Sequence, residues 1–418
     1  MFGSTCLSLR RAYGLLLALL FAWCAQPAYA QDSTLTRLIR QNRYPLTPSG
    51  KQFSGAGWDK MQAAIQKSQF VLIGEDHGTA EIPVFTAAVA RELKPALFVA
   101  EIDPYVAQEI THLVAQPGSP TTYLRQYPGA LCFYSFAEEF ELMRTLRTQQ
   151  TQLVGIDQVW SFAAAPFYNR LAEQVKSKPT RAYLKQRAAA YQAQDQANER
   201  QGGHTYAMTA QAPSAIDSLL AMTKKEGPAV QKMAQDYATS YRIYQGQIHG
   251  TGGHQERLNL MKRNLLQELR SYEATGSQAV PKTLFKFGSN HVARGLSPTR
   301  GGDFYDVGNF AQDLAEAQSH QSLHILIMGK QGSRAVSLNP TFPAKIARPY
   351  TEADADAEVE KPFLAQTSGP AWSVFDLRPL RTAISKGKLQ VSSQTLQRTI
   401  MGYDYLVVMP ETTASHPI

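Results

Sequence analysis

Cysteine is scarce in this chain, with only three among 418 residues. Cys6 and Cys24 fall within the first thirty residues, which have the features of an export signal, so that Cys132 alone would remain after cleavage. A single thiol has no partner in its own chain, and we therefore expect no intrachain disulfide and a buried, structural Cys132. The remainder of about 390 residues is long enough to be stabilised by one or two hydrophobic cores instead.

Long hydrophobic runs are absent beyond the N-terminus. The run AYGLLLALLFAWCA follows Arg10 and Arg11 and precedes the small-x-small sequence Ala28-Tyr29-Ala30, an order typical of a signal peptide cleaved near Ala30. It is shorter than the roughly 20 apolar residues that a membrane-spanning helix needs. We therefore expect residues 1–30 to be a signal peptide, the mature chain to have no membrane span, and the protein to be periplasmic or extracellular.

A tract of basic residues interleaved with aromatic ones is also missing. The formal net charge of +8 falls to +6 when the two charges of Arg10 and Arg11 leave with the signal peptide. The remaining basic residues are scattered among acidic ones, as in ARELKP. This pattern argues against nucleic acid as a partner, and it does not indicate an oligomeric state.

Short apolar runs that end in glycine or polar residues recur along the chain and predict buried strands of a parallel sheet. Helical patterns at Glu81 to Leu93, Tyr105 to Val114 and Phe310 to Gln318 lie between some of them. This alternation predicts an α/β fold with a mostly parallel sheet flanked by helices. The predicted strands are FVLIG (70 to 74), LFVAEI (97 to 102), LVGID (153 to 157), LFKFG (284 to 288), LHILIMG (323 to 329) and YLVVM (405 to 409).

The stretch between the third and fourth of these strands carries no strand pattern. It is rich in Ala, Gln, Lys, Arg and Leu at helical spacing, and glycine-rich loops interrupt it near 201–204 and 249–254. We expect a large helical insertion at about 160–280, of the kind that forms a lid or a substrate pocket. Residues 31–69 are expected to be a polar N-terminal lead, followed by one α/β domain over 70–418.

Ionisable residues follow four of the predicted strands. Glu75 and His77 come after the first strand, Glu101 ends the second, Asp157 ends the third, and Asn290 and His291 follow the fourth. In α/β sheets, ligands bind at the carboxyl ends of the strands. We therefore expect these side chains to line one crevice.

The residue types indicate acid–base chemistry. A histidine with a near-neutral pKa can take a proton from water when a carboxylate fixes its tautomer, so we expect His77 to be the base and Glu75 or Glu101 its orienting partner. His291 is a candidate acid, or a donor to an oxyanion together with Asn290. Arg257 either holds the substrate or pairs with a buried acid, and Asp157 either binds substrate or caps the next helix.

In these motifs and their order the chain resembles the erythromycin esterase-like family, within the broader group that includes the Tiki and ChaN-like haem-uptake proteins. The resemblance covers most of the chain from about Phe70 onward, and it implies metal-independent hydrolysis of an ester or lactone, with His77 as base and His291 as partner. Two details differ: the opening motif Glu-Asp-His is one residue shorter, and the fourth strand ends in one histidine where two are frequent. The matching segments are LIGEDHGTAEIPVF, LFVAEI, FYSFAEEFELMRTLRTQQTQLVGID, ERLNLMKRNLLQEL with Arg257, Met261 and Asn264, KFGSNHVARG and YDYLVVMPETTAS.

The leading hypothesis is thus an exported hydrolase that acts on a small-molecule substrate and uses no cofactor and no metal. Two alternatives stay open. The same histidine and glutamate cluster could hold haem or a metal ion in a periplasmic binding protein, although no His-x-x-x-His or Cys-x-x-Cys pair within that cluster strengthens this alternative. The chain could also be a family member that has lost its activity.

Overall fold

The computed structural model describes residues 34–201, 205–273, 280–299, 302–336 and 347–418. The predicted signal peptide lies outside this part of the chain. Within the described ranges, no helix combines the length and the apolar character that crossing a bilayer requires.

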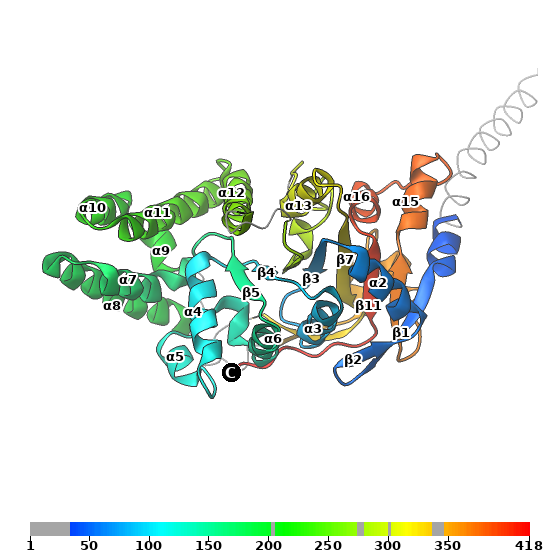
Figure 1. Cartoon of the computed structure of the whole chain (residues 1–418), viewed down its shortest axis with the longest axis horizontal. Helices are drawn as coiled ribbons and strands as arrows, with labels where there is room; N and C mark the ends of the chain where they lie inside the picture. The colour runs from blue at the N-terminus through cyan, green and yellow to red at the C-terminus, as the bar shows by residue number, and fades with distance from the viewer. Residues whose placement is uncertain (1–33, 202–204, 274–279, 300–301, 337–346) are drawn as a thin grey trace, which may run out of the picture.

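A nine-stranded sheet runs through the centre of the described structure, in the order β2-β1-β10-β11-β7-β3-β6-β4-β5 (Figure 1). The six strands from β11 to β5 are mutually parallel. They coincide with the six apolar runs, so the predicted α/β class and its mostly parallel sheet are confirmed. Their bounds are β3 Phe70–Glu75, β4 Leu97–Ala100, β5 Gln152–Gly155, β6 Thr283–Gly288, β7 Ser322–Gly329 and β11 Tyr405–Met409.

The sheet extends further than the sequence indicated. Strand β10 (Trp372–Asp376) pairs antiparallel with β11, and β1 (Arg43–Ser49) pairs antiparallel with β10 and with the short β2 (Gln52–Ser54). Part of the expected N-terminal lead therefore belongs to the sheet. Strand β1 carries two prolines and buries little of its surface, which is tolerated near a sheet edge and hides the strand from a hydrophobicity pattern.

Helices cover both faces of the sheet. Alternate residues of each strand enter opposite cores: in β3, Val71 and Ile73 face one side, and Phe70 and Leu72 the other. Strands buried on both faces read as continuous apolar runs, which is why these six strands were predictable. One core includes α2 (Ala56–Lys67), α3 (Glu81–Leu93), α4 (Pro104–Ala115) and α6 (Ala137–Thr148), and the other includes α12 (Gly253–Glu273), α13 (Val307–Glu316), α15 (Arg378–Ser385) and α16 (Gln394–Gly402).

Between β5 and β6 the described residues are helices and loops without a strand. Helices α7 to α11 extend to one side of the sheet (Figure 1) and form a third core around the fully buried Tyr168 and Tyr237, whose ring centroids are 5.1 Å apart. The bounds are α7 Ala164–Gln174, α8 Lys178–Arg200, α9 Ala207–Ala210, α10 Pro213–Thr223 and α11 Pro228–Ile248.

Candidate functional site

The site forms where four adjacent strands end. Glu75 is the last residue of β3, Glu101 follows β4, Asp157 lies two residues after β5, and His291 belongs to the 3₁₀ turn η3 (Ser289–His291) that follows β6. Strands β3, β6, β4 and β5 are neighbours in the sheet. Because all four run parallel, their carboxyl ends meet at one edge, and residues distant in sequence come together.

Glu101 lies between the two imidazoles. Its Oε2 is 3.4 Å from Nε2 of His77, and its Oε1 is 3.4 Å from Nε2 of His291. Oε2 also accepts a hydrogen bond from the Gly288 backbone N–H at 2.7 Å, and Oε1 accepts one from Nη2 of Arg257 at 2.7 Å. Burial alone would raise the pKa of Glu101, but the charges of His291 and Arg257 and the hydrogen bond with His77 hold that pKa well below its usual range. Glu101 is therefore an anion.

His77 is oriented from the other side by Glu75. Nδ1 of His77 lies 2.8 Å from Oε1 of Glu75. The same oxygen accepts a hydrogen bond from Nζ of Lys286 at 2.6 Å, and Lys286 also donates to Oε1 of Glu139 on α6 at 2.7 Å. Glu75, Lys286 and Glu139 are almost wholly buried, so the lysine compensates carboxylates that water cannot solvate.

The protonation of His77 follows from these neighbours. Burial lowers the pKa of His77, but the hydrogen bonds and charges of Glu101 and Glu75 outweigh it and raise the pKa to about 9. In the resting site His77 is therefore an imidazolium that donates to both carboxylates. About a third of its side chain is exposed (30%), so a small molecule can reach the ring.

The loop that carries His77 is held from several directions. The His77 ring stacks on Phe133, with centroids 3.9 Å apart and planes 12° apart. Gly78 adopts a φ of +84°, and a Cβ there would lie 2.2 Å from the carbonyl oxygen of Ala335. The Gly78 carbonyl accepts hydrogen bonds from the backbone N–H groups of Ala335 and Ser415 at 2.8 and 2.9 Å. Glycine is required at this close approach, and the contacts fix the position of the imidazole.

His291 is held by a second set of ionic contacts. Nδ1 of His291 lies 2.8 Å from Oδ2 of Asp306, which also caps α13. Burial lowers the pKa of His291, and the charges of Glu101 and Asp306 more than offset this, so that the pKa is raised. Arg257 on α12 donates through Nε and Nη2 to Asp157 at 2.9 and 2.5 Å, and its Nη1 is 3.3 Å from Nε2 of His291.

A cavity of about 860 Å³ opens over this cluster. Glu75, His77, Glu101, His291 and the exposed Asn290 line it, as the sequence analysis expected. Arg257 and Asp157, for which the sequence left substrate binding or a supporting role open, do not line it; they pair with each other, and Arg257 also contacts Glu101 and His291. One wall is aromatic, formed by Phe133, Phe136, Trp160, Phe162 and Tyr206.

Four site residues were not predicted. Lys286 carried a signal, because a single charged residue inside the apolar strand TLFKFG needs a buried partner of opposite charge. Glu139 lies on the buried side of α6 with Phe140 and Met143, which is a weaker signal of the same kind. Asp306 and Phe133 gave none, since only the tertiary fold brings them to the imidazoles.

Among the described residues, no group of three or more histidine, cysteine or acidic side chains is arranged to hold a metal ion. The oxygens of Glu75 and Glu101 already accept hydrogen bonds from Lys286, Arg257 and Gly288. Cysteine takes no part, since Cys132 is buried and burial raises the pKa of its thiol.

No family model matches the chain, and no curated protein does. Several solved structures share its fold. A Bacillus cereus protein superposes with a TM-score of 0.58 at 14% identity, over 93% of this chain and 99% of its own. A protein described as a succinoglycan biosynthesis protein superposes with a TM-score of 0.59 at 13% identity, also over 93% of this chain and 99% of its own. A mutant of erythromycin esterase EreC in its open conformation gives a TM-score of 0.55 at 17% identity, over 86% of this chain and 94% of its own. At these identities the likeness shows a common fold.

Proposed function

We propose that the protein is a hydrolase that cleaves an ester or lactone with a water molecule activated by His77, and that it needs no metal. The observation that carries this proposal is the pair of imidazoles on opposite oxygens of Glu101, at the floor of one cavity. The fold shared with an erythromycin esterase supports the reaction class. On the N-terminal sequence features, we also propose that the protein acts outside the cytoplasm.

Each nitrogen of His77 has a separate task. Nδ1–H donates to Glu75, which leaves Nε2, on the Glu101 side, to act as the base once it has lost its proton. The water oxygen bonds to the carbonyl carbon while a water proton moves to Nε2. When the tetrahedral intermediate collapses, the alkoxide oxygen takes the bonding electron pair and receives that proton from His77. Water and ester thus become acid and alcohol, and a lactone becomes a hydroxy acid.

The second half of the site stabilises negative charge. The raised pKa of His291 favours its protonated form, and Asn290 lies at the cavity surface beside it. Both can donate to the oxygen that becomes anionic during attack, and such preorganised donors are worth most where water is excluded. Arg257 fixes this arrangement because it contacts Glu101, Asp157 and His291 together.

The charges around the imidazoles favour this reading over a metal-binding protein. A metal ligand must offer a free lone pair, whereas the guanidinium of Arg257 lies 3.3 Å from Nε2 of His291. A cation bound at this point would be repelled by that guanidinium and by Lys286. The cavity places an aromatic wall beside the imidazoles and carboxylates, which suits a small organic substrate with an apolar part and a polar part.

Hydrolysis of a panel of p-nitrophenyl esters and lactones by wild-type protein and His77→Ala tests the proposal. We expect turnover by the wild type and a loss of at least about 100-fold in the variant, with an unchanged circular dichroism spectrum. His112→Ala, which removes an exposed histidine on α4, is the matched control and should keep full activity. Full activity of His77→Ala, or activity that tracks bound metal or haem measured on the same sample, would contradict the proposal.

A further inference from the structure

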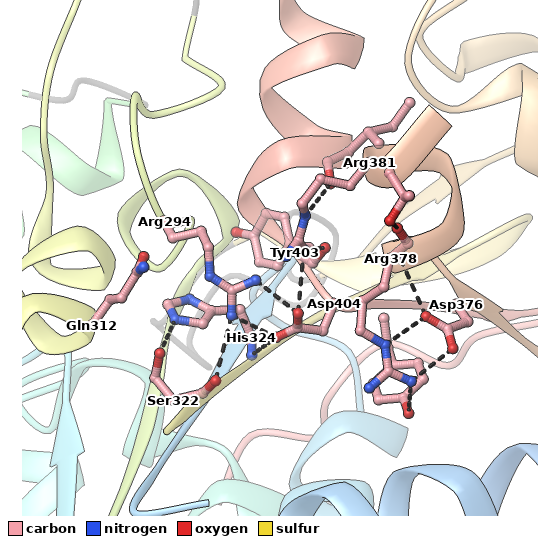
Figure 2. Close-up of polar contacts among 12 residues, drawn as sticks. Arg294, Gln312, Ser322, His324, Asp376, Arg378, Arg381, Tyr403 and Asp404 are labelled. Carbon is pink, nitrogen blue, oxygen red and sulfur yellow. Dashed lines mark hydrogen bonds and ion pairs between the residues drawn. The ribbon is translucent and has the colours of Figure 1, made fainter. Parts of the chain in front are cut away.

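A second hollow, of about 780 Å³, lies at the amino ends of strands β7 and β11. The cavity over His77 lies instead where strands end. The lining of the second hollow includes the first residues of β7 and β11, Ser322 and Tyr405, and it shares no residue with the cavity over His77. Figure 2 shows polar contacts of residues that line the second hollow, among them Arg294, Arg378, Arg381 and Asp404. We call it the arginine hollow, after Arg294, Arg378 and Arg381, which line it together with Lys60 and Lys67.

Positive charge exceeds negative charge in this hollow. The lining holds five cationic side chains, three arginines and two lysines, against the carboxylates of Glu316 and Asp404. A third carboxylate, Asp376, pairs with Arg378 from β10. The five cations thus exceed these three carboxylates by two charges, and a hollow with such a surplus attracts anions.

Two of the arginines share one carboxylate, as Figure 2 shows. Arg294 donates through Nη1 and Nη2 to both oxygens of Asp404, at 2.7 and 2.6 Å, and Arg381 donates to Oδ1 of the same residue at 3.2 Å. Their side chains are only 13% and 24% exposed. Burial lowers the pKa of Arg381 and the charge of Arg294 lowers it further, and the neighbouring carboxylate of Asp404 offsets these effects only in part.

Helix α15 carries cationic side chains near its N-terminus, where they do not stabilise the helix. Arg378 and Arg381 both lie at its start, and its first turn has no acidic residue. Cations at a helix N-terminus oppose the helix dipole. Arg378 is offset by Asp376, which accepts from Nε and Nη2 at 2.8 and 2.7 Å. Nη1 of Arg378 and Nη1 of Arg381 donate to no residue in the described part of the chain.

We propose that the arginine hollow binds a phosphate-type oxyanion carried on a small soluble molecule. The planar guanidinium fork matches the oxygens of a phosphate group, and the side-chain Nη1 groups of Arg378 and Arg381 supply donors to it. Lys60 and the exposed Lys67 on α2 lie at the same hollow and add charge. The hollow is much larger than inorganic phosphate, so it has room for the rest of a phosphate ester.

Titration calorimetry and thermal unfolding with inorganic phosphate, against sodium chloride of equal ionic strength, test this site. We expect phosphate to bind and to raise the unfolding temperature of the wild type beyond the chloride control. Arg381→Gln should weaken phosphate binding by about tenfold or more, as expected for one charge-assisted contact. Lys67→Gln, which removes an exposed charge and leaves the fold intact, should weaken it about two- to fivefold.

The control is Lys185→Gln, which removes an exposed lysine of α8 and should bind phosphate as the wild type does. Equal phosphate binding by the wild type, Lys67→Gln and Arg381→Gln, or no effect beyond chloride, would overturn the proposal. Binding of glycerol phosphate and of phosphatidylglycerol vesicles is compared next, because the phosphate group could be carried by a soluble molecule or by a lipid headgroup. We expect glycerol phosphate to bind at least as well as phosphate; binding to vesicles alone would overturn the soluble ligand.

Discussion

At the scale of single residues, two histidines show that neighbours, and not burial alone, decide protonation. Burial lowers the pKa of both His77 and His324. His77 lies between two carboxylates, and its pKa rises to about 9. His324, near the start of β7, lies beside the ion pair of Arg294 and Asp404 (Figure 2). Burial together with the charge of Arg294 lowers the pKa of His324 to about 3.

This contrast predicts two separate titrations in an NMR experiment on histidine-labelled protein. The His77 resonances should titrate near pH 9, above the ordinary value of 6.5, because deprotonation must give up hydrogen bonds to Glu75 and Glu101. Those of His324 should show a neutral ring down to about pH 3. Assignment comes from His77→Ala and His324→Asn. An ordinary pKa for His77 would show that the carboxylates do not hold it as described.

Lys286 supports the site by compensating two buried acids. We expect Lys286→Met to lower the free energy of unfolding by about 3–5 kcal/mol, the range for removing one partner of a buried pair. Urea unfolding monitored by circular dichroism measures this. The double variant Lys286→Met/Glu139→Gln also removes one of the uncompensated acids. We expect its free energy of unfolding to exceed that of Lys286→Met by about 1 kcal/mol or more. A single variant as stable as the wild type would contradict the compensating role.

At the scale of elements, the sequence predicted what depends on local pattern. The six central strands are buried on both faces and therefore appear as apolar runs, and α3 was expected and found at Glu81–Leu93. The strands β1 and β10 were not predicted. β1 has few buried residues, and its pairing with β10 joins Arg43 to Phe375 across most of the chain, a contact that no local pattern encodes.

In the candidate site, too, the residues that follow a local pattern were predicted and their contact partners were not. Glu75, His77, Glu101 and His291 were predictable because each follows an apolar strand, and parallel strands bring their ends together. Their hydrogen-bond partners were harder to find. Lys286 lies within a strand, Asp306 lies at the start of α13, and Phe133 belongs to the 3₁₀ turn η1 (Cys132–Ser135), so none of them is at a strand end.

The end of β6 contains a test of how closely the site is packed. A Cβ on Gly288 would lie 3.0 Å from Nε2 of His77 and 3.3 Å from Oε2 of Glu101. Gly288 has a φ of −54°, so alanine suits the backbone but displaces the two side chains. We expect Gly288→Ala to fold normally and to lose about 10- to 100-fold in kcat/KM, since small displacements of reacting groups are costly.

The matched control is Gly227→Ala. Gly227 precedes α11, and a Cβ added to it would meet no described atom within 4 Å, so this variant should keep full ester hydrolysis. If Gly288→Ala were as active as the wild type, the close packing of His77 against Glu101 would not matter for catalysis.

At the scale of the whole molecule, the sheet supplies the acid–base groups, and the helical stretch between β5 and β6 supplies part of the cavity wall. Phe162 and Tyr206 come from this stretch, and their ring centroids are 5.6 Å apart. Phe133, which precedes β5 in the chain, is the wall residue that stacks on His77. In the proposed reaction, the groups that react and the residues that hold the substrate would thus come from different parts of the molecule.

This separation predicts a kinetic difference. Phe162→Ala removes apolar wall without touching the imidazoles, so KM for an active ester should rise about threefold to tenfold while kcat changes little, the pattern of lost uniform binding. Steady-state kinetics of Phe162→Ala are compared with those of Phe133→Ala. The second variant also removes the ring stacked on His77 and should lower kcat. A fall in kcat for Phe162→Ala as large as that for His77→Ala would contradict the division.

The pH dependence of kcat/KM tests the central claim most directly, because only the neutral form of His77 can accept a proton from water. The pKa of His77 is raised to about 9, so kcat/KM should climb with pH, reach half of its limiting value near pH 9 and level off above about pH 10. Glu75→Gln removes one of the charges that raise this pKa and should move the rising limb to lower pH. A flat profile, or a limb that Glu75→Gln leaves in place, would contradict His77 as the base.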